Sequence, residues 1–128
     1  MDKSTTFACL VVGSRSFNNY GLMKAKLDKL LVNQDSVLIV SGGARGADTL
    51  AEQYAKERCC PCEVFPADWS TGKSAGFVRN EKMHKFISTF ESRGVVAFWD
   101  GKSRGTAHNF RLAEKYNNPL RVIRFKEG

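Results

Sequence analysis

Short apolar runs and longer amphipathic stretches alternate along the whole chain. The apolar runs lack a strict alternation of apolar and polar residues, and such continuous runs are typical of parallel strands that are covered on both faces. We expect strands at residues 7–12, 37–40, 62–65, 95–99 and 120–125. Between them, apolar residues recur at helical spacing, which predicts helices over residues 20–32, 47–58, 76–90 and 106–116.

This alternation predicts an α/β fold built on a single doubly wound, Rossmann-like parallel sheet. We expect about five strands and about four helices, joined by right-handed crossovers. The expected strand order is 3-2-1-4-5, with the first and fourth strands as neighbours. The chain has 128 residues, close to the most common length of a domain, so we expect residues 1–128 to form a single domain.

Three of the apolar runs end in a short turn of Gly, Ser and Arg ahead of a predicted helix. The turns are GSRS at residues 13–16, SGGARGAD at residues 41–48 and DGKSRGT at residues 100–106. The carboxyl ends of parallel strands meet at one edge of a sheet, so the three turns should lie together. Open backbone N–H groups at the start of a helix favour an anion. We therefore predict a site for a phosphate-bearing ligand at this edge.

Each turn also has a simpler explanation. The glycines of residues 42–46 permit the positive φ angles of a tight turn, and Asp48 is then the N-cap of the next helix. Turns that only connect elements have no need of arginine, however, and Arg15, Arg45 and Arg104 stand beside the glycines. A guanidinium offers two parallel donors to a phosphate, which favours the anion site.

The charge balance is basic but does not decide the ligand. The net charge is +7, and the positive residues are spread along the chain with no basic tail. This balance fits contact with nucleic acid or a smaller polyanion, and solvated helix faces give it equally, while the lack of a basic tail weakens the case for a DNA-binding arm. No apolar segment approaches the roughly 20 residues that span a bilayer, so we expect a cytoplasmic protein with no membrane partner.

Neither a metal site nor a cofactor is expected. The four cysteines, at positions 9, 59, 60 and 62, lack the paired spacing of a zinc site, and the two histidines lie far apart in the sequence. Cys9 falls within an apolar run and is predicted to be a core residue. Neither a Walker A motif nor a GxGxxG fingerprint is present, so ATP hydrolysis and ordinary NAD binding lose support.

The segment that joins the third strand to the third helix lies near the same edge. Trp69 either stacks on a base or packs on the rim of the sheet, and Ser74 either contacts the ligand or caps the helix. Lys73 is a candidate phosphate contact. His108 is either a donor in the site or a surface residue, and Trp99 is expected in the core.

Four segments carry a more specific pattern: GSRS after the first strand, SGGARGADTLA after the second, FVRNEKM on the third helix and FWDGKSRGTAHN after the fourth strand. Together they resemble the SLOG superfamily, which joins the DNA-processing protein DprA to the LOG-type phosphoribohydrolases. Within it, the chain is most similar to small stand-alone bacterial and phage members of the YspA-like branch. The resemblance covers nearly the whole chain.

The resemblance to LOG enzymes implies roles for the turn after the fourth strand. Their PGGxGTxxE loop corresponds to DGKSRGTAHN here, so Gly101, Gly105 and Thr106 match the part that cradles phosphate. The catalytic glutamate of those enzymes falls at Asn109, whose amide cannot transfer a proton. Arg79 matches their arginine beside the scissile bond. No catalytic residue is assigned; if the chain is an enzyme, the candidates are Arg79, Glu81 and Asp100.

The resemblance to DprA implies roles for the turn after the second strand. SGGARGAD is similar to a DprA loop that contributes contacts to single-stranded DNA and phosphate, so Ser41, Gly43 and Arg45 would supply donors. Asp48 would accept a hydrogen bond from ribose hydroxyls or would cap its helix. Related SLOG domains sense nucleotide-derived signals, including molecules of the cyclic ADP-ribose type in antiphage defence.

The leading hypothesis is a protein that binds a nucleotide or a nucleotide-derived signalling molecule without consuming it, as a sensor or a sequestering protein. The alternatives are a LOG-type nucleoside-monophosphate phosphoribohydrolase and a DprA-like binder of single-stranded nucleic acid. The residues predicted to bind the ligand are Gly13, Ser14, Arg15, Ser41, Gly42, Gly43, Arg45, Gly46, Asp48, Trp69, Ser74, Arg79, Asn80, Asp100, Gly101, Ser103, Gly105 and Thr106.

The resemblance also implies a homo-oligomer, because SLOG-like proteins commonly pair through helices that flank the pocket. Four apolar residues of the third helical segment either form such a face or pack on the sheet. They are Phe77, Phe86, Ile87 and Phe90.

Overall fold

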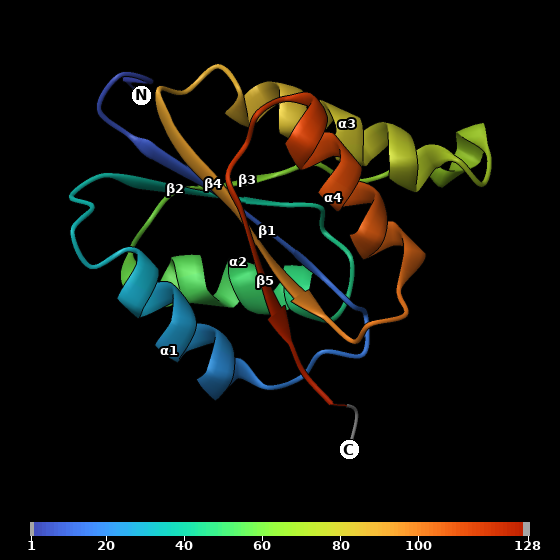
Figure 1. Cartoon of the computed structure of the whole chain (residues 1–128), viewed down its shortest axis with the longest axis horizontal. Coiled ribbons are helices and arrows are strands. Elements are labelled where there is room, and N and C mark those ends of the chain that lie inside the picture. Colours follow the sequence, from blue (N-terminus) through green and yellow to red (C-terminus); the bar gives the residue numbers. More distant parts are fainter. Residues whose placement is uncertain (1, 127–128) are drawn as a thin grey trace.

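The computed structural model describes residues 2–126 and contains one parallel sheet of five strands in the order β3-β2-β1-β4-β5 (Figure 1). The strands are β1 (Phe7–Gly13), β2 (Val37–Ser41), β3 (Cys62–Val64), β4 (Ser92–Trp99) and β5 (Leu120–Arg124). The helices are α1 (Tyr20–Leu30), α2 (Ala47–Arg58), α3 (Ala75–Ile87) and α4 (Arg104–Lys115), with a 3-10 turn η1 (Trp69–Thr71). The predicted α/β, Rossmann-like arrangement and its strand order are confirmed.

Both faces of the sheet are covered, which explains the continuous apolar runs. Along β1, Cys9 and Val11 face a core cluster that includes residues of α1 and α2, whereas Leu10 and Val12 join a second cluster with residues of α3. Figure 1 shows α1 and α2 on one side of the sheet and α3 and α4 on the other. Successive residues of this central strand are apolar because each one faces a layer of helices. The predicted core position of Cys9 is confirmed.

The elements begin and end close to their predicted positions. β4 begins at Ser92 rather than at residue 95, because its polar first residues pair with β1. α4 begins at Arg104 rather than at residue 106, because Ser103 forms the N-cap. α1 and α3 end two or three residues earlier than predicted. None of these shifts moves a loop away from the carboxyl edge.

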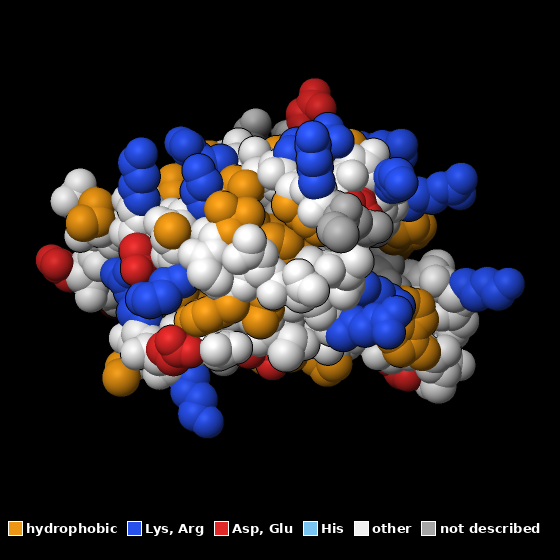
Figure 2. Space-filling model, turned by 90° about the horizontal axis from the view of Figure 1, so that it is seen from below, with side chains coloured by type: hydrophobic (Ala, Val, Ile, Leu, Met, Phe, Trp, Pro, Cys, Tyr) orange, Lys and Arg blue, Asp and Glu red, His pale blue; other side chains and the backbone are white. Residues whose placement is uncertain are grey.

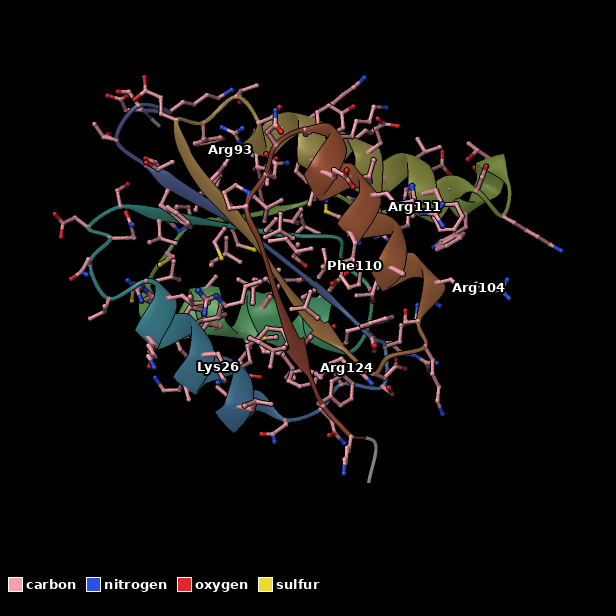
Figure 3. All side chains as sticks on the ribbon, in the orientation of Figure 1. Lys26, Arg93, Arg104, Phe110, Arg111 and Arg124 are labelled. Atoms are coloured by element: carbon pink, nitrogen blue, oxygen red, sulfur yellow. The ribbon has the colours of Figure 1, made fainter. Side chains whose placement is uncertain are left out.

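Trp99 is half-buried at the end of β4 rather than enclosed in the core. Its ring meets Phe110 of α4 edge-on, with 5.1 Å between the ring centres, and the Arg124 guanidinium lies 5.2 Å from its centre. Both partners are labelled in Figure 3. The indole N–H donates to the carbonyl oxygen of Ser103 at 3.1 Å. Trp99 therefore holds the start of α4 against the sheet.

The four residues predicted as a possible pairing face separate in the structure. Ile87 and Phe90 are buried, and Phe86 packs against the same core cluster, whereas Phe77 is exposed. Packing on the sheet, the other predicted role, therefore holds for three of them. Homo-oligomerisation stays a prediction.

The positive side chains on the surface of the described residues lie in separate groups. Figure 2 shows the Lys and Arg side chains of one face in several groups, with apolar and neutral surface between them. Across residues 2–126, no helix combines the length and the apolar character of a membrane span. The single domain and the cytoplasmic location stay predictions.

Candidate functional site

Ser14 joins the three loops at the carboxyl edge of the sheet. Its N–H donates to the Phe98 carbonyl oxygen of β4 at 2.9 Å, and its own carbonyl oxygen accepts from the Ala47 N–H at the start of α2 at 3.3 Å. Its hydroxyl oxygen accepts from the N–H of Asp100, in the loop after β4, at 3.1 Å. The loops after β1, β2 and β4 therefore lie together, as the strand order predicts.

Two glycines make this close approach possible. Gly46 has a φ of +81°, and a Cβ there would lie 2.5 Å from the carbonyl oxygens of Ser14 and Arg15. A Cβ at Gly13 would lie 2.5 Å from the Cβ of Ala47. Since no side chain fits at either place, both glycines are required for contact between the loops themselves.

A cavity of about 690 Å³ opens where the loops meet. This volume is within the range of sites for small molecules. Its wall comes from the loops after β1, β2 and β4, from η1 and from α3 and the start of α4. Of the residues predicted to bind the ligand, those that line it are Gly13, Ser14, Arg15, Arg45, Asp48, Trp69, Arg79, Asn80, Asp100, Ser103, Gly105 and Thr106.

The other predicted binding residues lie outside this lining. Gly42 and Gly43 line a second, adjoining cavity of about 560 Å³. Ser41 is buried, and its hydroxyl donates to the Glu52 carboxylate at 3.0 Å while its oxygen accepts from the Gly43 N–H at 3.2 Å. Its role is therefore to hold the loop after β2. The remaining residues outside both linings are Gly46, Ser74 and Gly101.

Several lining residues were not predicted from the sequence. Gly76, Asn80 and Met83 follow one face of α3 at intervals of four and three residues, and this spacing is the signal that could have identified Gly76 and Met83. Lys73, a predicted phosphate contact, also lines the cavity. The lining residues that were not predicted to bind the ligand are Val12, Ser16, Ala44, Gly76, Phe77, Met83 and Asn109.

Arg79 is the most constrained cation of the wall. Its Nη1 donates to the Gly42 carbonyl oxygen at 2.5 Å, and its Nε donates to Asn80 Oδ1 at 2.9 Å. Burial lowers the pKa of the guanidinium, and the nearby charge of Arg15 acts in the same direction. Arg79 is thus a fixed, partly desolvated cation at the cavity.

Asp48 does not cap α2, contrary to one of its two predicted roles. The N-cap is Gly46, and Asp48 lies within the first turn of the helix. Its Oδ2 accepts from the Ala44 N–H at 3.1 Å, which closes the loop after β2. The residue is only 7% exposed, and this burial raises the pKa of its carboxyl to about 6, although the Ala44 N–H and the charge of Arg79 oppose the rise.

The loop after β4 leaves the start of α4 open. Asp100 Oδ1 accepts from the N–H groups of Lys102 and Ser103, both at 2.8 Å. The next two N–H groups, those of Arg104 and Gly105, donate to no acceptor among residues 2–126. A Cβ at Gly105 would meet nothing within 4 Å. The positive end of the α4 dipole therefore reaches the cavity at Gly105.

The Arg104 side chain lies outside the cavity lining, although the sequence placed it with the other two loop arginines. It is exposed, and Figure 3 shows it extending away from the start of α4. The guanidinium groups of the wall are those of Arg15, Arg45 and Arg79.

Glu81, a candidate acid if the chain is an enzyme, lies outside the cavity lining. Its Oε2 accepts from Lys115 Nζ at 2.7 Å and from the Tyr116 hydroxyl at 2.5 Å. These two hydrogen bonds lower the pKa of the Glu81 carboxyl to about 2. Glu81 therefore joins α3 to the end of α4, away from the open start of that helix.

A buried polar network lies behind the cavity, where Asn109 forms part of the lining. Asn118 Nδ2 lies 3.0 Å from His84 Nδ1, and an amide nitrogen can only donate, so Nδ1 accepts and the ring proton is on Nε2. Nε2 then donates to Asn109 Oδ1 at 3.1 Å, while Asn109 Nδ2 donates to the Gly105 carbonyl oxygen at 3.1 Å. Burial lowers the pKa of His84 to about 4, so the ring is neutral. The network fixes the orientation of the Asn109 amide.

Trp69, Ser74 and His108 each had two predicted roles. Trp69 lies at the mouth of the cavity with 54% of its surface exposed, and the Arg15 guanidinium lies 5.8 Å from its ring centre. Ser74 precedes α3, but its side chain makes no capping hydrogen bond. His108 lies outside the cavity lining, but its Nδ1 is 3.3 Å from Asn80 Nδ2 and its ring packs on Phe77, and both of these residues line the cavity.

Comparison with protein families and curated proteins gives two matches. The model of the "YspA, cpYpsA-related SLOG family" matches residues 8–72. The Gene 61 protein of Mycobacterium phage D29 is 33% identical over 118 residues, which cover 87% of this chain and 91% of that protein.

Two solved structures of DNA processing protein A resemble this chain in fold. The protein from Helicobacter pylori, for which a single-stranded DNA binding mode is described, matches with a TM-score of 0.64 and 24% identity over 95% of this chain and 67% of its own. The protein from Streptococcus pneumoniae matches with a TM-score of 0.64 and 20% identity over 97% of this chain and 52% of its own. The chain thus spans about half the length of the Streptococcus pneumoniae protein.

Proposed function

The chain belongs to the YspA, cpYpsA-related SLOG family, and we propose that it binds a nucleotide or a nucleotide-derived signalling molecule in the cavity where the three loops meet. One observation carries the proposal: Arg15, Arg45 and Arg79 line a cavity of about 690 Å³. Family membership and the fold shared with DNA processing protein A support a nucleotide or nucleic-acid ligand in general. The cavity volume favours the smaller of the two.

Each part of a nucleotide meets a matching group in this arrangement. Arg15 and Arg79 supply guanidinium donors for phosphate, and the open N–H of Gly105 adds a donor at the positive end of α4. The buried carboxylate of Asp48 accepts hydrogen bonds from ribose hydroxyls. The exposed ring of Trp69 offers a face on which a base can stack.

We propose binding without turnover, in a sensor or a sequestering protein. Neither candidate carboxylate is placed to act as the acid of an enzyme. Asp100 accepts hydrogen bonds from two N–H groups of its own loop. Glu81 forms an ion pair with Lys115 and lies outside the cavity lining. Asn109 holds both halves of its amide in hydrogen bonds and has no proton to transfer.

A phosphoribohydrolase is the second candidate, and one observation favours it. Burial raises the pKa of Asp48 to about 6, and a carboxyl that titrates close to neutral pH is suited to general acid or base catalysis. Asp48 is also in the lining, so its carboxyl faces the same ligand.

Calorimetric titration with nucleoside mono- and diphosphates tests the proposal, followed by chromatography of the mixture. We expect saturable binding of one nucleotide per chain, with all nucleotide recovered intact. Free base that accumulates in proportion to protein, and that Asp48→Asn abolishes, would establish the hydrolase instead. Binding restricted to oligonucleotides, with an affinity that falls steeply with salt, would establish a nucleic-acid binder.

A further inference from the structure

The second cavity shares a wall with the first. Both are lined by the three arginines and by the aromatic ring at the mouth, together with one loop residue: Arg15, Arg45, Arg79, Trp69 and Ala44. On the far side of this wall, the second cavity of about 560 Å³ is completed by Gly42, Gly43, Pro66 and Ala67. The site therefore has two compartments with the cations between them.

The shared wall is short of negative charge. Arg15 and Arg79 are close enough for the charge of Arg15 to lower the pKa of Arg79, an effect that adds to burial. Asp48 raises the pKa of Arg79 by more than Arg15 lowers it, but Asp48 lines the first compartment alone. An anion at the wall would contact both guanidinium groups and remove their mutual repulsion.

The second compartment has the chemistry of a base site. Two of its polar backbone groups are engaged within the protein: the Gly43 N–H donates to Ser41 Oγ, and the Gly42 carbonyl oxygen accepts from Arg79. Away from the arginines of the shared wall, its side chains are small and apolar, with Pro66 and Ala67 at its edge, and the Trp69 ring lies at the shared wall.

Local structure holds the Trp69 ring at this boundary. Asp68 Oδ1 accepts from the Ser70 N–H at 3.2 Å and closes η1 around the tryptophan. Gly76 of α3 leaves room for the indole, because a Cβ there would lie 3.2 Å from Trp69 Cη2. A base in either compartment can therefore reach the same fixed ring.

On the basis of the proposed function, we propose that the ligand contains two nucleosides joined through phosphate. The linking phosphate lies at the shared wall against Arg15 and Arg79. One nucleoside occupies the compartment of Asp48, and the other occupies the compartment edged by Pro66 and Ala67. Two sources share this chemistry, a free 5′–5′-linked dinucleotide and a short 3′–5′-linked fragment of nucleic acid.

Calorimetric titration compares ADP, diadenosine diphosphate and the 5′-phosphorylated dinucleotide pApA, together with their guanine forms. Each of these carries two phosphates, so a gain over the mononucleotide comes from the second nucleoside. We expect at least one of the two linked forms to bind about 10- to 100-fold more tightly than the mononucleotide, which corresponds to the stacking of one additional base. The form that shows the gain identifies the source.

Ala67 lines the second compartment and not the first, so Ala67→Trp enlarges a side chain on the far side of the shared wall. It is expected to remove the gain while the mononucleotide binds as in the parent protein, which also reports that the variant is folded. Ala67→Leu is measured alongside, so that a folding defect in the larger variant leaves the test intact.

Equal affinities for one and two nucleosides would overturn this inference and leave the proposed function standing. A gain that survives in both Ala67 variants would overturn it as well, because the second nucleoside would then lie elsewhere. If none of the probes binds, the proposed function fails together with the inference.

Discussion

The loop after β2 directs its polar groups back to the protein, whereas the loop after β4 presents its own to the cavity. In the first, the Ala44 N–H donates to Asp48, and the first N–H of α2, that of Ala47, donates to Ser14. In the second, the N–H groups of Arg104 and Gly105 have no acceptor among residues 2–126. Both loops are turns rich in Gly, Ser and Arg, so their composition alone does not separate the two roles.

The position of the aspartate makes the difference. Asp48 lies inside the helix that follows its loop, so its carboxylate reaches back and accepts from the loop. Asp100 is the first residue of its loop and accepts from the N–H groups of Lys102 and Ser103, which leaves the N–H groups of Arg104 and Gly105 without an acceptor among residues 2–126. The first arrangement stabilises the loop after β2, and the second leaves N–H donors at the start of α4 for an anion.

The largest effect on stability is expected at Gly46, in the loop after β2. Gly46→Ala places a Cβ 2.5 Å from two carbonyl oxygens at a φ of +81°. Backbone strain and steric overlap together should lower the free energy of unfolding by about 4 kcal/mol. The matched control is Gly105→Ala, where a Cβ meets nothing, and we expect its stability to stay within about 0.5 kcal/mol of the parent protein. Urea denaturation measures both, and similar losses in the two variants would contradict the comparison.

The Asp48 carboxyl and the buried His84 ring should change the free energy of unfolding in opposite directions as pH rises. Asp48, with a pKa raised to about 6, binds a proton more tightly when folded, so its contribution to stability falls as pH rises from about 4 to 6. His84, with a pKa lowered to about 4, binds a proton less tightly when folded, so its contribution rises with pH over about the same range. Each effect amounts to about 3 kcal/mol, and the two nearly cancel.

Asp48→Asn should therefore expose the contribution of His84. Its free energy of unfolding should rise by about 3 kcal/mol between pH 4 and pH 6.5, where the parent protein gives a nearly flat profile. Chemical denaturation at a series of pH values measures this difference. Parallel profiles for the two proteins would show that Asp48 is not the buried carboxyl described here.

Arg79 connects the two roles, since it is held by the loop after β2 and lines the cavity. Arg79→Lys keeps the charge but loses the planar donors, so nucleotide affinity should fall by about 2 kcal/mol, or about 30-fold. Arg104→Ala is the control, because its side chain is exposed and outside the lining, and it should change affinity about twofold at most. Equal losses in the two variants would indicate general attraction by positive charge.

The smallest effect is expected at the open helix start. In Gly105→Ala, a methyl group enters the space beside an N–H that is available to phosphate, and nucleotide affinity should fall by about 1 kcal/mol while stability is kept. Calorimetry on the same variant that serves as the stability control measures this loss. Unchanged affinity would remove the start of α4 from the site.

The sequence predicts the sheet well because both of its faces are buried, so nearly every residue of β1 and β2 is apolar. It also places Arg15 and Arg45 at the cavity, since strand order brings the loops together, whereas Arg79 is assigned to the site from the resemblance alone. It leaves open whether Asp48 caps its helix or accepts from a ribose, and it does not predict the hydrogen bond from the Ala44 N–H, because that bond depends on the path of the preceding loop. The network of His84 and Asn109 depends on a contact between α3 and α4, which no local pattern contains.

The central claim is that the three loops form one site that holds a nucleotide by its phosphates, and NMR titration of the ¹⁵N-labelled protein with ADP tests it most directly. We expect the amide signals of Arg15, Arg45 and Gly105 to shift along one binding curve, while that of Lys26 on α1 (Figure 3) stays in place. Shifts that saturate at different concentrations, or that spare Gly105 and gather on another face, would contradict the account.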